Sequence, residues 1–95
     1  MVTRIVKVYP LNSREYTDKS GQKKIFKSKA FIIHDGKSSY YVEAIQENAE
    51  SIESLNAKEG DVVNVHVSCR AREFSTKDGE VKYANEITLT HMMKL

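Results

Sequence analysis

Five segments rich in Val, Ile, Tyr, Phe and Thr, separated by short turn sequences, most constrain how this chain can fold. Turn sequences stand at residues 18–21 (DKSG), 35–36 (DG) and 77–79 (KDG), where Asp, Ser and Gly allow tight reversals of an extended chain. We therefore expect β-strands at about residues 2–16, 23–34, 37–44, 62–74 and 80–92. Pro10 lies within the first segment and lacks a backbone N–H, so we expect that strand to bend there.

The segment between the third and fourth expected strands has a helical pattern. Its apolar residues recur at intervals of four, three and three, at Ile45, Ala49, Ile52 and Leu55, which is typical of an amphipathic helix. Gly60 then supplies a turn into the next strand. The order of three strands, one helix and two strands predicts an all-β fold, a five-stranded OB-fold barrel with one short helix between strands 3 and 4. A three-stranded meander followed by a hairpin is the alternative.

Composition limits the size and the setting of the fold. The 95 residues are 40% apolar, which is enough for one modest core, so we expect residues 1–95 to form a single domain. Cys69 is the only cysteine, so no intramolecular disulfide is expected and a reducing, cytoplasmic location is favoured. The start MVTRIVKVYP lacks the pattern of a signal peptide, and no apolar run approaches the about 20 residues that span a bilayer. We therefore expect no membrane partner.

Charge is distributed unevenly along the chain. Residues 1–34 carry eight Lys/Arg and two Asp/Glu (net +6), residues 35–61 carry two and seven (net −5), and residues 62–95 carry five and four (net +1), which gives the overall +2. A basic first third beside an acidic middle favours one surface that meets a polyanion. Chance clustering on solvated strands is the alternative.

Alternation along the strands predicts two faces, because successive side chains of a strand point in opposite directions. The core is expected to receive Phe26, Ala30, Ile32, Tyr40, Val42, Ala44, Val63, Val65, Val67, Cys69 and Ala71. The outer face is expected to carry cations and aromatic rings together: Lys27, Lys29, Phe31, Tyr41, Arg70, Arg72 and Phe74. Lys23, Lys24 and Lys77 lie in or beside the first and last hairpin turns, where they are positioned to clamp a strand or are ordinary polar turn residues.

Cations and flat rings on one face are typical of proteins that bind single-stranded nucleic acid. Lys and Arg contact phosphates in a salt-dependent way, and each base stacked on a ring contributes about 1 to 3 kcal/mol. We therefore predict that these ten residues form a nucleic-acid-binding site. The alternative is that the outward aromatic residues are buried against a protein partner or a second copy of the chain.

Residues that would support catalysis or metal binding are not evident. His34, His66 and His91 are dispersed without metal-ligand spacing, and the sequence has no Gly-rich phosphate loop and no nucleophile elbow. We predict that the protein is not an enzyme and has no metal, no cofactor and no small-molecule substrate.

Three motifs follow one another in the second half: KEGDVV at 58–63, RAREF at 70–74 and KDG at 77–79. Over about residues 45–92 they resemble the bacterial and phage single-stranded-DNA-binding proteins, or a compact, tail-less OB domain like those of primosomal replication proteins. The resemblance implies that Phe74 is a stacking aromatic and that Arg70 and Arg72 are basic contacts. It also implies a homo-oligomer, either a dimer or a tetramer. The chain has no tryptophan, the family's usual stacking residue, and we expect a tail-less member without the family's acidic tip.

The leading hypothesis is non-catalytic binding of single-stranded DNA in replication, recombination or repair. The alternative is a protein–protein interaction module on an OB fold with weak or no nucleic-acid binding. RNA binding in the manner of cold-shock domains is a third hypothesis, which is less favoured because those domains place more aromatic rings on adjacent strands. The fold alone does not choose among them.

Overall fold

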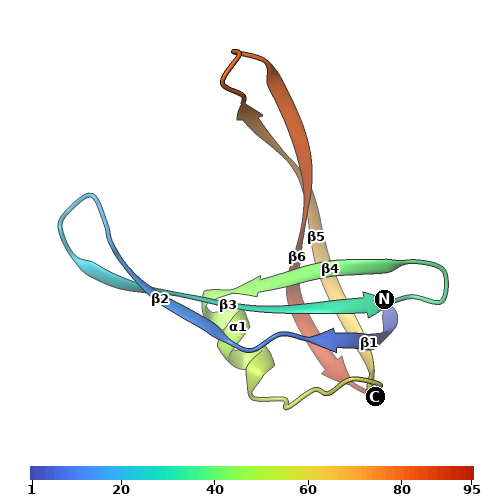
Figure 1. Cartoon of the computed structure of the whole chain (residues 1–95). Helices are drawn as coiled ribbons and strands as arrows, with labels where there is room; N and C mark the ends of the chain where they lie inside the picture. The colour runs from blue at the N-terminus through green and yellow to red at the C-terminus, as the bar shows by residue number, and fades with distance from the viewer.

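A computed structural model describes residues 1–95 as six strands and one helix (Figure 1). In chain order these are β1 (Val2–Val8), β2 (Asn12–Thr17), β3 (Lys23–His34), β4 (Ser39–Ile45), α1 (Gln46–Glu53), β5 (Val62–Ser75) and β6 (Val81–Lys94). The sheet has the order β1-β5-β6-β4-β3-β2, and β1 also pairs with β3, so the strand pairings form a closed ring. The predicted order of strands and helix is confirmed. The eight-residue helix α1 is too short to span a bilayer.

The first predicted strand is two strands in the structure. β1 and β2 separate at residues 9–11, around Pro10, because proline cannot donate a ladder hydrogen bond and fixes its own φ. As a result β1 is part of the ring, where it pairs with β3 and β5, whereas β2 pairs with the first half of β3 as a hairpin outside the ring. The sheet therefore has six strands instead of five, and the expected bend at Pro10 is a break.

The core lies inside the ring, and α1 packs against β3, β4 and β6. The buried apolar cluster consists of Ile5, Phe31, Ile33, Val42, Ala44, Ala49, Ile52, Val63, Val65, Leu89 and Met92. Ala49 and Ile52 are the helix's contribution, at two of the predicted helical positions. After the helix, Gly60 has φ +89°, a conformation that glycine adopts without steric cost, and the chain turns there into β5.

Two hairpins extend from the ring as arms (Figure 1). The first arm, residues 12–28, pairs β2 with the start of β3, and every residue of β2 is exposed. The second arm, residues 68–88, pairs the distal parts of β5 and β6, and β5 is exposed from Ser68 onward. A two-stranded ribbon buries little apolar surface, so the arms depend on backbone pairing and on their turns.

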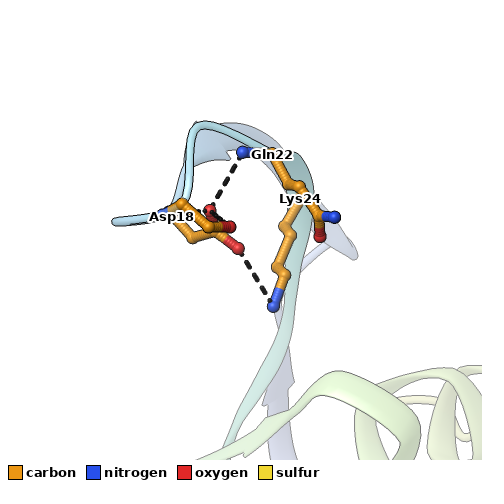
Figure 2. Close-up of polar contacts among 4 residues, drawn as sticks. Asp18, Gln22 and Lys24 are labelled. Atoms are coloured by element: carbon orange, nitrogen blue, oxygen red, sulfur yellow. Dashed lines mark hydrogen bonds and ion pairs between the residues drawn. The ribbon is translucent and has the colours of Figure 1, made fainter.

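The turn of the first arm is organised by one carboxylate. Asp18 Oδ1 accepts hydrogen bonds from the backbone N–H of Ser20 (2.9 Å) and of Gln22 (3.0 Å), and Oδ2 lies 3.3 Å from Lys24 Nζ (Figure 2). Gly21 takes φ +84° in the same turn. The predicted turn sequence therefore closes through its aspartate and its glycine.

The predicted faces of β3 are wrong. Phe31, expected to face outward, is 1% exposed and lies in the core. β3 and β4 pair Phe31 with Val42 and Ile32 with Tyr41, and directly opposed residues of two strands share a face. Because Val42 is buried, Phe31 must be buried too, and Phe26, Ala30 and Ile32 turn to the side that carries Tyr41. Of these three, Ala30 is still buried, as predicted.

The predicted core face of β5 is correct only near the ring. Val63 and Val65 are buried, but Cys69 and Ala71 are exposed. Both lie in the second arm, where the ribbon has left the core and has no layer against it. Side-chain alternation continues there without creating an interior.

Candidate functional site

A hollow of about 520 Å³ lies where the second arm leaves the ring, beside the single pair between β4 and β6, Glu43 with Thr88. Its lining comes from both parts of the molecule: Phe26, Tyr41, Glu43, Ile45, Arg70, Asn85, Glu86, Ile87 and Thr88. We call it the arm hollow. It is the place where side chains of the ring and of an arm meet.

A second hollow, of about 330 Å³, lies at the break between β1 and β2. Its lining residues are Tyr9, Pro10, Leu11, Asn12, Ser28, Ala30, Tyr41 and Glu43. We call it the Pro10 hollow. Tyr41 and Glu43 line both hollows, so the two hollows adjoin each other across β3 and β4 on either side of these two side chains. We call the two hollows together the groove.

Aromatic rings are available along this groove. Tyr41 is 55% exposed and meets Tyr9 edge to face, with ring centroids 5.9 Å apart. Phe26 is half-buried, and the Arg14 guanidinium carbon lies 5.2 Å from the centroid of its ring. Burial and the nearby charge of Glu43 raise the pKa of Tyr41 above its usual value, so its hydroxyl stays protonated at neutral pH. Exposed aromatic rings are the kind of surface on which bases can stack.

Two guanidinium groups stand on the second arm: that of Arg70, which lines the groove, and that of Arg72, which lies further along the arm. Arg70 Nε and Arg72 Nη1 each lie 3.1 Å from a carboxylate oxygen of Glu86. Their side chains are 73% and 63% exposed, and ion pairs this exposed contribute little stability. The guanidinium groups can therefore exchange Glu86 for a phosphate at small cost.

Two predicted binding residues lie on the opposite side of β3. Lys27 pairs with Glu50, and Lys29 Nζ lies 2.7 Å from Glu53 Oε2 with only 8% of its side chain exposed. Both lysines share the face of Phe31, because alternate residues of a strand point the same way. The prediction that these three residues lie beside Tyr41 is wrong, and α1 neutralises both cations.

The remaining predicted residues lie along the arms. Phe74 is exposed on the second arm and, by alternation, on the same side as Arg70 and Arg72. Lys77 is exposed in the turn of that arm. Lys23 and Lys24 are exposed beside the turn of the first arm. The structure therefore brings Tyr41 and Arg70 together at the groove and leaves the other five further along the arms.

Sequence reasoning missed several groove residues. Phe26 was assigned to the core because the faces of β3 were inverted. Tyr9 and Leu11 flank Pro10. The bend expected at Pro10 was a signal for them, because side chains beside a strand break can turn toward a different surface. Alternation places Glu43 on the outward face beside Tyr41, but its chemistry gave no reason to assign it to a site, since a single carboxylate on a strand is ordinarily a solvated residue.

Comparison with known proteins places the chain among OB folds. A family model described as "Domain of unknown function (DUF3127)" matches residues 17–92. No curated protein matches the chain.

Two solved structures have the same architecture. The second OB-fold domain of replication protein A from Methanococcus maripaludis is 20% identical with a TM-score of 0.58, and the match covers 99% of this chain and 79% of that one. A mitochondrial single-stranded-DNA-binding protein of S. cerevisiae is 15% identical with a TM-score of 0.56, covering 100% and 90%. These likenesses confirm the predicted OB fold and, at the level of the fold, the resemblance to single-stranded-DNA-binding proteins.

Proposed function

The chain belongs to the DUF3127 family, and we propose that it binds single-stranded DNA along the groove, without catalysing a reaction. The observation that supports this proposal is the joint exposure of two rings, Phe26 and Tyr41, beside the guanidinium group of Arg70. Both structural neighbours come from proteins whose names refer to replication or to single-stranded DNA. A role in replication, recombination or repair is part of this proposal.

The groove suits a single strand better than a duplex. In a duplex the faces of each base are covered by its stacked neighbours, whereas a single strand can place its bases on protein rings. A strand that follows the groove has bases on Phe26 and Tyr41 and phosphates near Arg14 on one side and Arg70 on the other. The lysines at the arm tips, Lys24 and Lys77, extend the cationic path.

A different surface favours a second function, self-association. Exposed apolar side chains gather on the outer side of β1, at the start of β5 and near the two ends of the chain: Met1, Val2, Val6, Val62 and Met93. Strand pairing places Val2 opposite Asn64 and Asn64 opposite Met93. We propose that this side forms a dimer or tetramer interface, which leaves the groove free for DNA.

Titration of labelled oligo-dT of about 30 nucleotides at low and moderate salt tests the binding proposal. We expect affinity to fall with salt, with each phosphate contact contributing about 0.7 to the logarithmic slope for a single strand. Phe26→Ala and Tyr41→Ala should each lose about 1 to 3 kcal/mol of binding free energy, because each removes a stacking surface. Arg70→Ala with Arg72→Ala should lower the salt slope.

The matched control is Lys37→Ala with Lys58→Ala, which also removes two positive charges. Lys37 lies in the β3–β4 turn and Lys58 in the turn after α1, and neither lines the groove. We expect this control to retain most of the affinity and the salt slope. An equal loss in the control, or no binding of the unmodified protein at low salt, contradicts the proposal.

A further inference from the structure

Glu43 does not fit a surface that binds only phosphates. Its side chain is half-buried on β4, opposite Ala30, and it lines both hollows of the groove. It forms no ion pair with any Lys or Arg of the chain, whereas Glu86, the other carboxylate of the arm hollow, is paired with Arg70 and Arg72. The middle of the groove therefore carries an unneutralised negative charge.

This charge determines which part of a nucleotide can lie beside it. A phosphate near a half-buried carboxylate is repelled more strongly than it would be in bulk water, because water screens the two charges less there. The phosphates must then pass on the outer sides of the groove, near the arginines. A base, which is uncharged, is the part of a nucleotide that can face Glu43.

The Pro10 hollow has the dimensions and lining of a site for one base. Its volume of about 330 Å³ is at the lower end of the range of ligand pockets. Tyr41 and Tyr9 supply rings on one side, Leu11 supplies an apolar wall, and Asn12 and Glu43 supply polar groups. A flat, hydrogen-bonding ligand matches this combination.

We propose that the Pro10 hollow reads one base of the bound strand and that Glu43 selects guanine. An ionised carboxylate has two acceptor oxygens and no donor. Guanine presents two donors side by side on its Watson–Crick edge, N1–H and the N2 amino group, so one carboxylate can accept both. Recognition of unstacked bases through this edge is common for single-stranded nucleic acids.

The other three bases fit a carboxylate less well. Cytosine and adenine each place their amino group beside a ring nitrogen that is itself an acceptor, which faces the second carboxylate oxygen unfavourably. Thymine offers one N–H between two carbonyl oxygens. Each therefore gives at most one hydrogen bond to Glu43 together with a repulsive contact. This selectivity rests on the proposed binding of single-stranded DNA and adds a preference within it.

The test uses an oligo-dT of about ten nucleotides with one central position changed to dG, dC, dA or deoxyinosine. We expect dG to raise affinity about tenfold over dT, since a good bidentate contact gives discrimination of this order. Deoxyinosine, which lacks the N2 amino group, should lose most of that gain. Glu43→Gln should abolish the preference for dG, because an amide presents one acceptor and one donor.

Glu86→Gln is the matched control, since it also neutralises one carboxylate of the groove. It should keep the preference for dG, and thermal unfolding should show that both variants are folded. Equal affinity for all oligonucleotides with a preserved salt dependence overturns the selectivity and leaves the binding proposal standing. A dG preference that survives Glu43→Gln overturns the role of Glu43, and failure to bind any oligonucleotide overturns both proposals.

Discussion

The closed ring and the two arms share the strands β3, β5 and β6 but are held together differently. In the ring, side chains from opposed strands bury one another, as Phe31 and Val42 do. In the arms, backbone pairing continues while most side chains are exposed, including all of β2 and β5 from Ser68 onward. The side chains inside the ring therefore stabilise the fold, whereas those of the arms are accessible to a ligand. The groove lies at the junction, where Tyr41 of the ring meets Arg70 of the second arm.

Two phenylalanines of β3 provide the strongest test of this comparison. Phe31→Ala should cost about 3 to 5 kcal/mol of unfolding free energy, because it empties a fully buried site. Phe26→Ala should cost about 1 kcal/mol, since its ring is half-buried on the groove side. Urea denaturation measures both. The order should be reversed for DNA affinity, where Phe26→Ala loses more than Phe31→Ala. Equal losses of unfolding free energy in the two variants would contradict the assigned faces.

Lys29 and Glu53 test whether the lysines on the α1 side of β3 contribute to stability and not to DNA binding. Glu53→Ala leaves the buried Lys29 ammonium without its partner and should cost about 1 to 3 kcal/mol of unfolding free energy. Lys29→Met keeps the apolar stem and removes the charge, so it should cost less. Urea denaturation again gives the two values.

Neither change should alter affinity for oligo-dT, because both side chains lie on the face of β3 away from the groove. A lower salt slope for Lys29→Met would show that Lys29 reaches the DNA, as the sequence had predicted.

The strand and helix positions were predictable because their signals are local. Turn residues at 18–21, 35–36 and 77–79 and the spacing of Ala49 and Ile52 act within a few positions of the chain. β3 begins and ends where predicted. The faces of β3 depend on whether the β3–β4 turn has an even or an odd length, and the expected strands at 23–34 and 37–44 already left an even turn, at 35–36.

That length fixes which residues share a face. His34 pairs with Ser39, so four residues form the turn. With any even number of turn residues, odd-numbered residues of β3 oppose even-numbered residues of β4. An inward Val42 then requires an inward Phe31, and the two face predictions were compatible only with an odd-numbered turn.

Alternation places Glu43 beside Tyr41, but it could not predict the exposure of Cys69 or the approach of the second arm to Glu43. Both depend on where the second arm separates from the ring and on the pairing of β6 with β4 at that point. These are contacts between residues far apart in the chain, which a period-two pattern does not contain.

Glu86 tests whether its ion pairs with Arg70 and Arg72 compete with DNA phosphates for the two guanidinium groups. Glu86→Gln removes the partner of both Arg70 and Arg72, and we expect affinity for oligo-dT at low salt to rise about two- to fivefold, given the small energy of exposed pairs. Fluorescence titration gives the change. Glu80→Gln, at the arm's turn and outside any ion pair, is the matched control, and an equal gain there would mean that only net charge matters.

The smallest effect is expected at the tip of the first arm, from Asp18. Hydrogen bonds from the Ser20 side chain and the Gln22 backbone hold the pKa of Asp18 below its usual value of 3.8. A carboxyl whose pKa is lowered by folding stabilises the turn fully above its unfolded pKa, and that contribution is lost as pH falls through the folded pKa. The turn should therefore be ordered at neutral pH and should loosen below pH 3.8.

Amide chemical shifts of Ser20 and Gln22, followed from about pH 5 to about pH 2, measure this loosening. Because the arm contributes no side chain of β2 to the core, the amides of the ring strands should hardly change over the part of the range where the protein stays folded. Asp18→Asn should loosen the same turn at neutral pH, with little change in unfolding free energy. If the Ser20 and Gln22 amides do not respond to acid, the ionised carboxylate is not what orders the turn. If the ring amides respond equally, the arm and the ring are not the separate units that their burial indicates.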